Sequence, residues 1–244
     1  MTKNTLLFTA FTALLFISCN NNTSEPDNYK EPDVLSSVLM PLEAGYEWKY
    51  KWYDLNSDGS LGDEIPLYAF NMTIKDTSYD PEHIYKEKVY HAVYYYPYTG
   101  YETKYAWFYR NYKDGLYLMG GNNQGDTLYT KLLYYKYPVQ KGDTWLSPHL
   151  VFVYYDWQYY IADSVKYTCT DTNAVFETPL GSFKCFVFYH REKQEEDVVE
   201  QLDIYDYYAP NVGLVGRIIN SYYEYENKSY PKYKQMLYST NVKY

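Results

Sequence analysis

The stretch Tyr46-Glu47-Trp48-Lys49-Tyr50-Lys51-Trp52-Tyr53 decides the fold class of this chain. Its aromatic residues stand at every second position, and charged residues fill most of the positions between them. Successive side chains of a β-strand point to opposite faces, so this alternation predicts a strand with one buried face. A polar turn at Asn56-Ser57-Asp58-Gly59 follows, and a second alternating run extends from Leu67 to Lys75.

Comparable segments continue to the end of the chain, with Gly, Asn, Asp and Pro between them. They include a predicted strand over 150–161 and two separate ones over 165–170 and 174–178. No segment of ten or more residues has a convincing helical period. The chain also contains 37 tyrosines in 244 residues, and tyrosine favours strands. We therefore expect an all-β fold: an antiparallel sheet of roughly ten or more strands, built as a curved sheet, a half-barrel or a sandwich.

The N-terminus is typical of a secreted lipoprotein. Lys3 provides a positive charge, and an apolar run from Leu6 to Ile17 is shorter than the roughly 20 residues that a membrane helix needs. Ser18 and Cys19 end this run in a pattern that resembles a bacterial lipobox, although Phe16 stands where leucine is usual. The resemblance implies cleavage before Cys19 and lipid, palmitate included, on that cysteine.

Residues 20–38 are polar, interrupted by proline and poor in apolar side chains. We expect residues 1–18 to be a lipoprotein signal peptide, residues 19–38 a lipidated flexible tether, and residues 39–244 one antiparallel β domain. This organisation predicts a cell-envelope protein that is lipid-anchored to a membrane, which we expect to be the outer membrane, with the domain either periplasmic or surface-exposed.

The formal net charge is −9, and the isoelectric point is about 5.0. A chain without a basic stripe is a poor partner for nucleic acid. We expect a monomer whose partners are the membrane and a lipid or glycan ligand. The many aromatic residues could form a surface for sugars or lipids, or could reflect strand propensity alone.

Two segments share a pattern of proline, aliphatic residue, glycine and tryptophan. The first contains Pro41, Gly45 and Trp48, and the second Pro138, Gly142 and Trp145. Proline ends the preceding segment, glycine permits the turn, and tryptophan starts the next strand pointing inward. The repetition predicts two related strand entries.

Two further motifs read as tight turns. Pro179 and Gly181 lie in the first, and Pro210 and Gly213 in the second, where Asn211 and Gly213 suit positive φ. Together with the two strand entries, they resemble uncharacterised Bacteroidota lipoproteins of the TapB-like domain family. The family pattern has Ala where Leu180 stands and Gly where Asn211 stands. The resemblance covers residues 39–220 and implies an antiparallel β domain in the cell envelope, without catalytic residues to transfer.

The loop from Asp54 to Ile65 contains the first half of a calcium-binding pattern. Oxygen ligands would come from Asp54, Asn56, Asp58 and the carbonyl of Ser60. Ile65 stands at the position of the usual bidentate glutamate, and the flanking segments are strands. The alternative is a polar hairpin loop. We expect no other cofactor.

Cys169 and Cys185 could form a disulfide in an oxidising compartment. If residues 165–190 form a three-strand meander, the two cysteines lie on strands that flank a middle one. Two strand spacings are about 9.6 Å, which is beyond the usual reach of a disulfide. A bulge or a different strand order would permit the bond.

Catalytic patterns are weak throughout. The four histidines, His83, His91, His149 and His190, show no metal-ligand spacing, and the chain contains no nucleophile elbow or phosphate loop.

Asp203 and Asp206, near Glu200, could pair as acid and base, but such carboxylates more often form a solvated face. We therefore expect a non-enzyme that binds a hydrophobic or other small envelope ligand or supports an envelope assembly. The alternatives are a surface glycan-binding lipoprotein that uses aromatic stacking and, less favoured, a glycan hydrolase.

Overall fold

The computed structural model describes residues 37–79, 88–123, 126–153, 158–193 and 200–244. The predicted signal peptide, the lipidation site Cys19, His83 and the tether up to residue 36 lie outside these described residues. Ser37 and Val38 lead directly into Leu39 and Met40, whose side chains are buried in the hydrophobic core.

The all-β prediction is confirmed. The described residues form thirteen strands and one short 3-10 turn, η1 (Pro66–Tyr68). Within the described parts of the chain, no helix has the length and apolar character to cross a membrane. The strands are β1 (Glu47–Leu55), β2 (Leu61–Glu64), β3 (Phe70–Tyr79), β4 (Lys88–Tyr96), β5 (Tyr101–Tyr112), β6 (Gly115–Asn123), β7 (Asp126–Lys136), β8 (Thr144–Val153), β9 (Gln158–Thr178), β10 (Gly181–Lys193), β11 (Glu200–Ala209), β12 (Gly213–Tyr223) and β13 (Lys228–Thr240).

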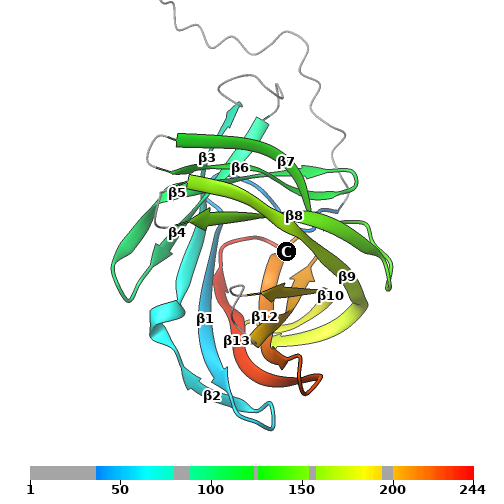
Figure 1. Cartoon of the computed structure of the whole chain (residues 1–244). Helices are drawn as coiled ribbons and strands as arrows, with labels where there is room; N and C mark the ends of the chain where they lie inside the picture. Colours follow the sequence, from blue (N-terminus) through cyan, green and yellow to red (C-terminus); the bar gives the residue numbers. More distant parts are fainter. Residues whose placement is uncertain (1–36, 80–87, 124–125, 154–157, 194–199) are drawn as a thin grey trace, which may run out of the picture. The chain divides into compact units, whose positions relative to one another are not determined.

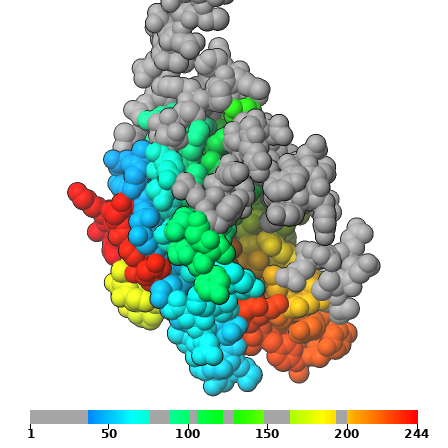
Figure 2. Space-filling model, turned by 90° about the vertical axis from the view of Figure 1, so that its left-hand side faces the viewer, coloured from blue at the N-terminus to red at the C-terminus, as the bar shows by residue number. Residues whose placement is uncertain are grey.

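All of these strands belong to one antiparallel sheet with the order β7-β6-β5-β4-β3-β1-β13-β12-β11-β10-β9-β8, and β2 pairs with β1 outside this path. The sheet curls until it nearly closes into a barrel (Figure 1). The first and last strands, β1 and β13, are directly paired, and their blue and red segments lie side by side in Figure 2. The two end strands of the sheet are β7 and β8, and the hydrogen-bonded strand order is open between them. We call this gap in the strand pairing the β7–β8 seam.

The predicted strand boundaries are wrong in the region of residues 150–178. The structure ends β8 at Val153 and begins β9 at Gln158, so no single strand runs over 150–161. It also joins the two short strands predicted over 165–170 and 174–178 into the continuous 21-residue strand β9. The polar residues Asp171, Thr172 and Asn173 separate the two predicted strands, but β9 continues through them, and its pairing with β10 shifts register at Val187.

The distal part of the β9–β10 hairpin packs against β12 on one side of the sheet. The ring of Phe176 lies so close to Gly216 that an added Cβ there would meet its Cε1 atom at 2.1 Å. Glycine is therefore required at this crossing because any side chain would displace the ring. The main core continues from this contact into the barrel interior.

The two related strand entries share the same backbone geometry. Gly45 and Gly142 both have φ of 92°. The Gly45 amide donates to the carbonyl of Ile74 on β3, and the Gly142 amide donates to the carbonyl of Cys169 on β9. Each entry thus fastens its strand to a later strand in its own half of the chain, β1 to β3 and β8 to β9.

Candidate functional site

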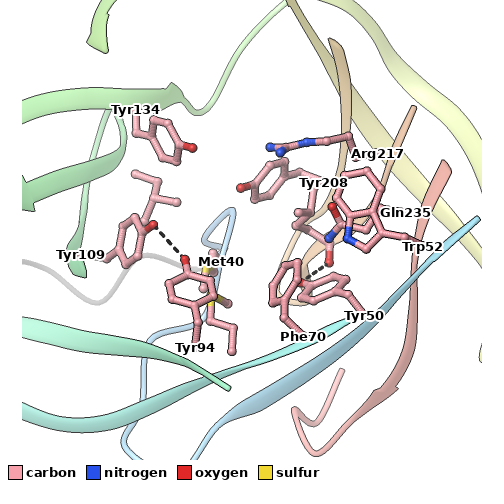
Figure 3. Close-up of a pocket in the computed structure, with 13 residues that line it drawn as sticks. Met40, Tyr50, Trp52, Phe70, Tyr94, Tyr109, Tyr134, Tyr208, Arg217 and Gln235 are labelled. Atoms are coloured by element: carbon pink, nitrogen blue, oxygen red, sulfur yellow. Dashed lines mark hydrogen bonds between the residues drawn. The ribbon is translucent and has the colours of Figure 1, made fainter. Parts of the chain in front are cut away.

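The barrel interior contains a cavity of about 170 Å³ (Figure 3). Nine strands and the lead-in segment before β1 surround it, and aromatic rings form most of its wall. The lining residues are Met40, Tyr50, Trp52, Phe70, Met72, Tyr94, Tyr109, Leu116, Tyr134, Tyr208, Leu214, Arg217 and Gln235.

A transverse row of side chains crosses the sheet at the level of this cavity. Strand register places Asp206 on β11 opposite Arg217 on β12, Arg217 opposite Gln235 on β13, and Gln235 opposite Trp52 on β1. Directly opposed residues have Cβ atoms about 4.5–5.5 Å apart, so neighbouring members of the row can interact. Register therefore brings together an acid, a guanidinium and an amide from three consecutive strands and an indole from the distant strand β1.

Asp206 is the fully buried acid of this row. One carboxylate oxygen accepts a hydrogen bond from Arg217 Nε, and the other accepts one from the hydroxyl of Tyr135 at 2.6 Å. His190 Nδ1 lies 3.8 Å from the second oxygen, while His190 Nε2 is 3.0 Å from Glu192. A buried carboxylate needs such partners, because an uncompensated charge in the interior is strongly destabilising.

Arg217 is held by Asp206 at one edge of its guanidinium. Burial acts to lower the pKa of Arg217, but the charge and hydrogen bond of Asp206, together with Tyr135 and Tyr134, outweigh it and raise that pKa well above its usual value. Among the described residues, its hydrogen bond to Asp206 uses only Nε, one of five N–H donors that a guanidinium carries. The guanidinium points into the cavity, towards the hydroxyls of Tyr134 and Tyr208 (Figure 3).

Gln235 contributes a buried donor without a partner. Gln235 is 1% exposed, and its Nε2 atom has no hydrogen-bond partner in the described part of the chain. Leaving a buried amide donor unpaired costs about 1–3 kcal/mol. Such an atom on a cavity wall is what a site would contain if its partner belonged to a ligand.

The tyrosine hydroxyls of the cavity remain protonated. Burial raises the pKa of Tyr50, Tyr109 and Tyr208 well above the usual value, and it also raises that of Tyr134. Tyr50 donates to the carbonyl of Leu214 at 2.8 Å. The wall thus offers neutral phenols together with the guanidinium and amide, and N–H and O–H donors predominate over charged acceptors.

Of the predicted calcium ligands, Asp54 lies near the end of β1, and Asn56, Asp58 and Ser60 lie in the β1–β2 turn. Asn56 Nδ2 donates to Ser60 Oγ at 2.9 Å, and Ser60 N donates to Asp58 Oδ1 at 2.9 Å. Gly59 has φ of 81°. These hydrogen bonds close the loop as a polar hairpin, which was the alternative interpretation, and binding of calcium by Asp54, Asn56, Asp58 and Ser60 stays a prediction.

Cys169 and Cys185 are buried free thiols on adjacent strands. The meander with a middle strand between them was wrong, since β9 pairs directly with β10. Cys169 is opposite Phe188, three residues along β10 from Cys185. Three residues span roughly 10 Å of strand, so the register rather than an intervening strand separates the two sulfur atoms.

The two predicted turns connect neighbouring strands. Pro179 and Leu180 join β9 to β10, and Gly181 has φ of 122°. Pro210 and Asn211 lie between β11 and β12, and Asn211 has φ of 63°. Asn211 also exchanges two hydrogen bonds with Val38, which ties the lead-in segment to this turn.

The proline motifs place their tryptophans differently. Trp48 is completely buried and donates from Nε1 to the carbonyl of Val212 at 2.7 Å. Trp145 donates from Nε1 to the carbonyl of Tyr134 on β7 at 3.2 Å. Pro41 and Pro138 precede these strands. The motif residues are not among those that line the cavity, whereas Met40, next to Pro41, is.

Asp203 and Asp206 are not brought together as a catalytic pair. They are three residues apart in a regular part of β11 and so face opposite sides of the sheet. Both are buried, which corrects the expectation of a solvated face. Asp203 accepts hydrogen bonds from Tyr189, Arg191 and Ser229, and Glu200 pairs with Lys232 at 2.6 Å.

Arg217 and Gln235, the polar residues of the cavity wall, were not predicted from the sequence, and Asp206 was considered only as an acid or base paired with Asp203. Asp206 alternates with Ile204 and Tyr208, and Gln235 alternates with Leu237, so both are polar residues at inward-facing positions. A polar residue in an apolar row is a usable signal for a buried site. The register that aligns these rows across four strands is not contained in any one segment.

Comparison with known proteins adds no family assignment. No family model and no curated protein matches the chain. Two solved structures are similar: a presumed lipoprotein from Parabacteroides distasonis ATCC 8503, and a presumed exported protein with a YmcC-like fold from Bacteroides fragilis NCTC 9343. Both give a TM-score of 0.45 and cover 84% of this chain and 99% of the other, with 16% and 13% identity respectively. The resemblance to the TapB-like family stays a prediction.

Proposed function

We propose that this protein is a non-catalytic lipoprotein of the bacterial cell envelope, whose β domain binds a small, mainly hydrophobic ligand inside the barrel. The observation that carries the proposal is the aromatic-lined cavity with an unpartnered buried amide, Gln235, in its wall. Ligand sites are typically apolar cavities with a few convergent polar groups.

The cavity limits the size of this ligand. Its volume of about 170 Å³ is close to the roughly 150 Å³ of an apolar cavity that binds benzene. It therefore accommodates one ring, or the end of a chain, and a whole membrane lipid would need a larger space.

Toluene is a suitable probe for this proposal. A ligand that binds only the folded state raises its melting temperature, so we expect toluene to raise the Tm of the full chain. Leu214→Phe should abolish the shift because it fills the cavity. Leu146→Phe is the matched control, since Leu146 is 64% exposed and lies away from the lining. Absence of a shift in the wild-type protein would contradict the proposal.

Anchoring through Cys19 is a separate part of the proposal. It is supported by the lipobox-like sequence and by the polar segment that follows it. We expect the native chain to sediment with membranes and to incorporate labelled palmitate. Cys19→Ser should abolish both, and membrane association that survives this substitution would show that another contact anchors the protein.

A second candidate function is recognition of surface glycans. The β12–β13 turn carries three clustered tyrosines, with the ring centroid of Tyr223 at 5.8 Å from Tyr225 and 6.0 Å from Tyr230. Tyr225 is 71% exposed and Tyr230 is 42% exposed. If this cluster stacks on sugars, Tyr225→Ala should reduce retention on immobilised polysaccharide, whereas Leu214→Phe should leave it unchanged.

A further inference from the structure

The polar part of the cavity wall contains hydrogen-bond donors that the protein itself does not use. Arg217 presents N–H groups that Asp206 does not use, and Gln235 Nε2 has no partner among the described residues. Asp206, the acceptor beside them, already accepts hydrogen bonds on both of its oxygens. The unused N–H donors of Arg217 and Gln235 need acceptor oxygens, so the polar group of a ligand that satisfies them is an acceptor.

The positions of these donors define the shape of that group. Arg217 and Gln235 are directly opposed on β12 and β13, and both line the cavity. Their donors can therefore converge on one planar group with two oxygens. The guanidinium fork matches a carboxylate, and its contact with Asp206 fixes its orientation from behind.

Charge distinguishes a carboxylate from a phosphate. Asp206 and Arg217 already compensate each other in the interior. A single added negative charge would still face the guanidinium, the amide and the protonated hydroxyls, whereas a dianion would leave a larger uncompensated charge in a buried site.

We infer that the ligand is a small monocarboxylic acid, whose carboxylate is bound by Arg217 and Gln235 and whose apolar body lies against the aromatic wall formed by Phe70, Tyr94 and Tyr109. This inference rests on the proposed function, because it concerns the same cavity. Gln235 is then a binding residue, and its amide donor, which is unpaired in the free protein, donates to the ligand's carboxylate in the complex.

The test compares three probes that share one ring: benzoate, benzyl alcohol and toluene. Titration calorimetry on the full chain at neutral pH should give benzoate an affinity on the order of tenfold higher than benzyl alcohol, as a charge-assisted hydrogen bond predicts. Phenyl phosphate should bind more weakly than benzoate.

Two variants identify the residues. Gln235→Leu should weaken binding of benzoate relative to binding of toluene and raise the Tm of the unliganded protein, because it removes the unpaired amide. Replacing Arg217 alone would leave Asp206 unpaired, so the second variant combines Arg217→Met with Asp206→Asn. It should abolish the preference for benzoate over benzyl alcohol.

The outcomes separate this inference from the proposed function. If toluene binds but benzoate has no advantage, or if both variants keep that advantage, the carboxylate inference is wrong and the cavity remains a ligand site. If none of the three ring probes binds, both are wrong. A stronger affinity for phenyl phosphate than for benzoate would replace the carboxylate with a phosphate ester.

Discussion

Asp203 shows how one residue links stability to pH. Its carboxylate is 3% exposed and accepts hydrogen bonds from Arg191 at 2.7 Å and Tyr189 at 2.8 Å, and from Ser229. Burial acts to raise the pKa of Asp203, but these donors, Arg191 first, together outweigh it and lower that pKa below its usual value. A lowered pKa in the folded state stabilises the fold at higher pH, and the stabilisation disappears as the pH falls through the folded-state value.

Asp203→Asn should therefore destabilise the protein by about 1.5–3 kcal/mol at pH 7, the contribution expected of hydrogen bonds to a charged group. The difference from wild type should shrink in acid, below the unfolded-state pKa of about 3.9. Urea unfolding across this range would measure it, with Asp63→Asn on exposed β2 as the control. A difference that is independent of pH would contradict the assignment.

The reactivity of the thiols of Cys169 and Cys185 gives a second prediction at the scale of residues. Burial raises the pKa of Cys169 to about 11 and that of Cys185 to about 12. Because the thiolate is the reactive form, neither should react readily with iodoacetamide at pH 8 in the folded protein. Mass spectrometry should find both alkylated after denaturation without reductant. Two unmodified cysteines and a mass lower by two hydrogens would instead reveal a disulfide.

At the scale of elements, the turns show that glycine is required for two different reasons. Gly142 has φ of 92°, but an added Cβ there would meet nothing within 4 Å. Gly213 has φ of 100°, and an added Cβ would lie 3.2 Å from Met40 Cγ and 3.4 Å from Trp48 Nε1. The first position is limited by backbone conformation, whereas the second is also limited by the packing of the lead-in segment.

Gly142→Ala should accordingly cost about 1–2 kcal/mol, the penalty for a left-handed backbone. Gly45→Ala should cost a similar amount, because it has the same φ and the same open surroundings. Gly213→Ala should cost more, since overpacking adds to the strain. Thermal unfolding of the three variants would test this order. Equal losses of stability would mean that the side chains of Met40 and Trp48 move aside without an energetic cost.

At the scale of the whole molecule, the β7–β8 seam separates two halves that are otherwise continuous. β1 is paired on both sides, with β3 and β13, whereas β8 is paired only with β9. Across the seam, the structure has the bond from Trp145 to Tyr134 and the ion pair between Lys136 and Asp143 at 2.9 Å. An exposed ion pair contributes little, so the seam is the weakest line of the barrel.

Hydrogen exchange should reveal this difference. Amides of β1 should be protected close to the level of global unfolding, while those of β8 that face the seam should exchange faster through local opening. Lys136→Ala should accelerate exchange in β8 and leave β1 unchanged. Equal protection of the two strands would indicate that backbone pairing closes the seam in solution.

The sequence by itself determined the elements. The alternation at Tyr46–Tyr53 predicted the first strand, and the shared pattern around Gly45 and Gly142 predicted two related strand entries. These features are local: side-chain periodicity and turn geometry depend on residues that are close in the chain. The continuous strand β9 escaped prediction because cross-strand pairing with β10 overrides the polar sequence at its centre.

Only the tertiary structure decided the closure of the barrel and the composition of the cavity. Asp206, Arg217, Gln235 and Trp52 become neighbours through the registers of β11, β12, β13 and β1. A register shift of one residue would turn any of these side chains to the other face of the sheet. Register depends on how every strand packs with its neighbours, so the polar row could not be read from any segment of the chain alone.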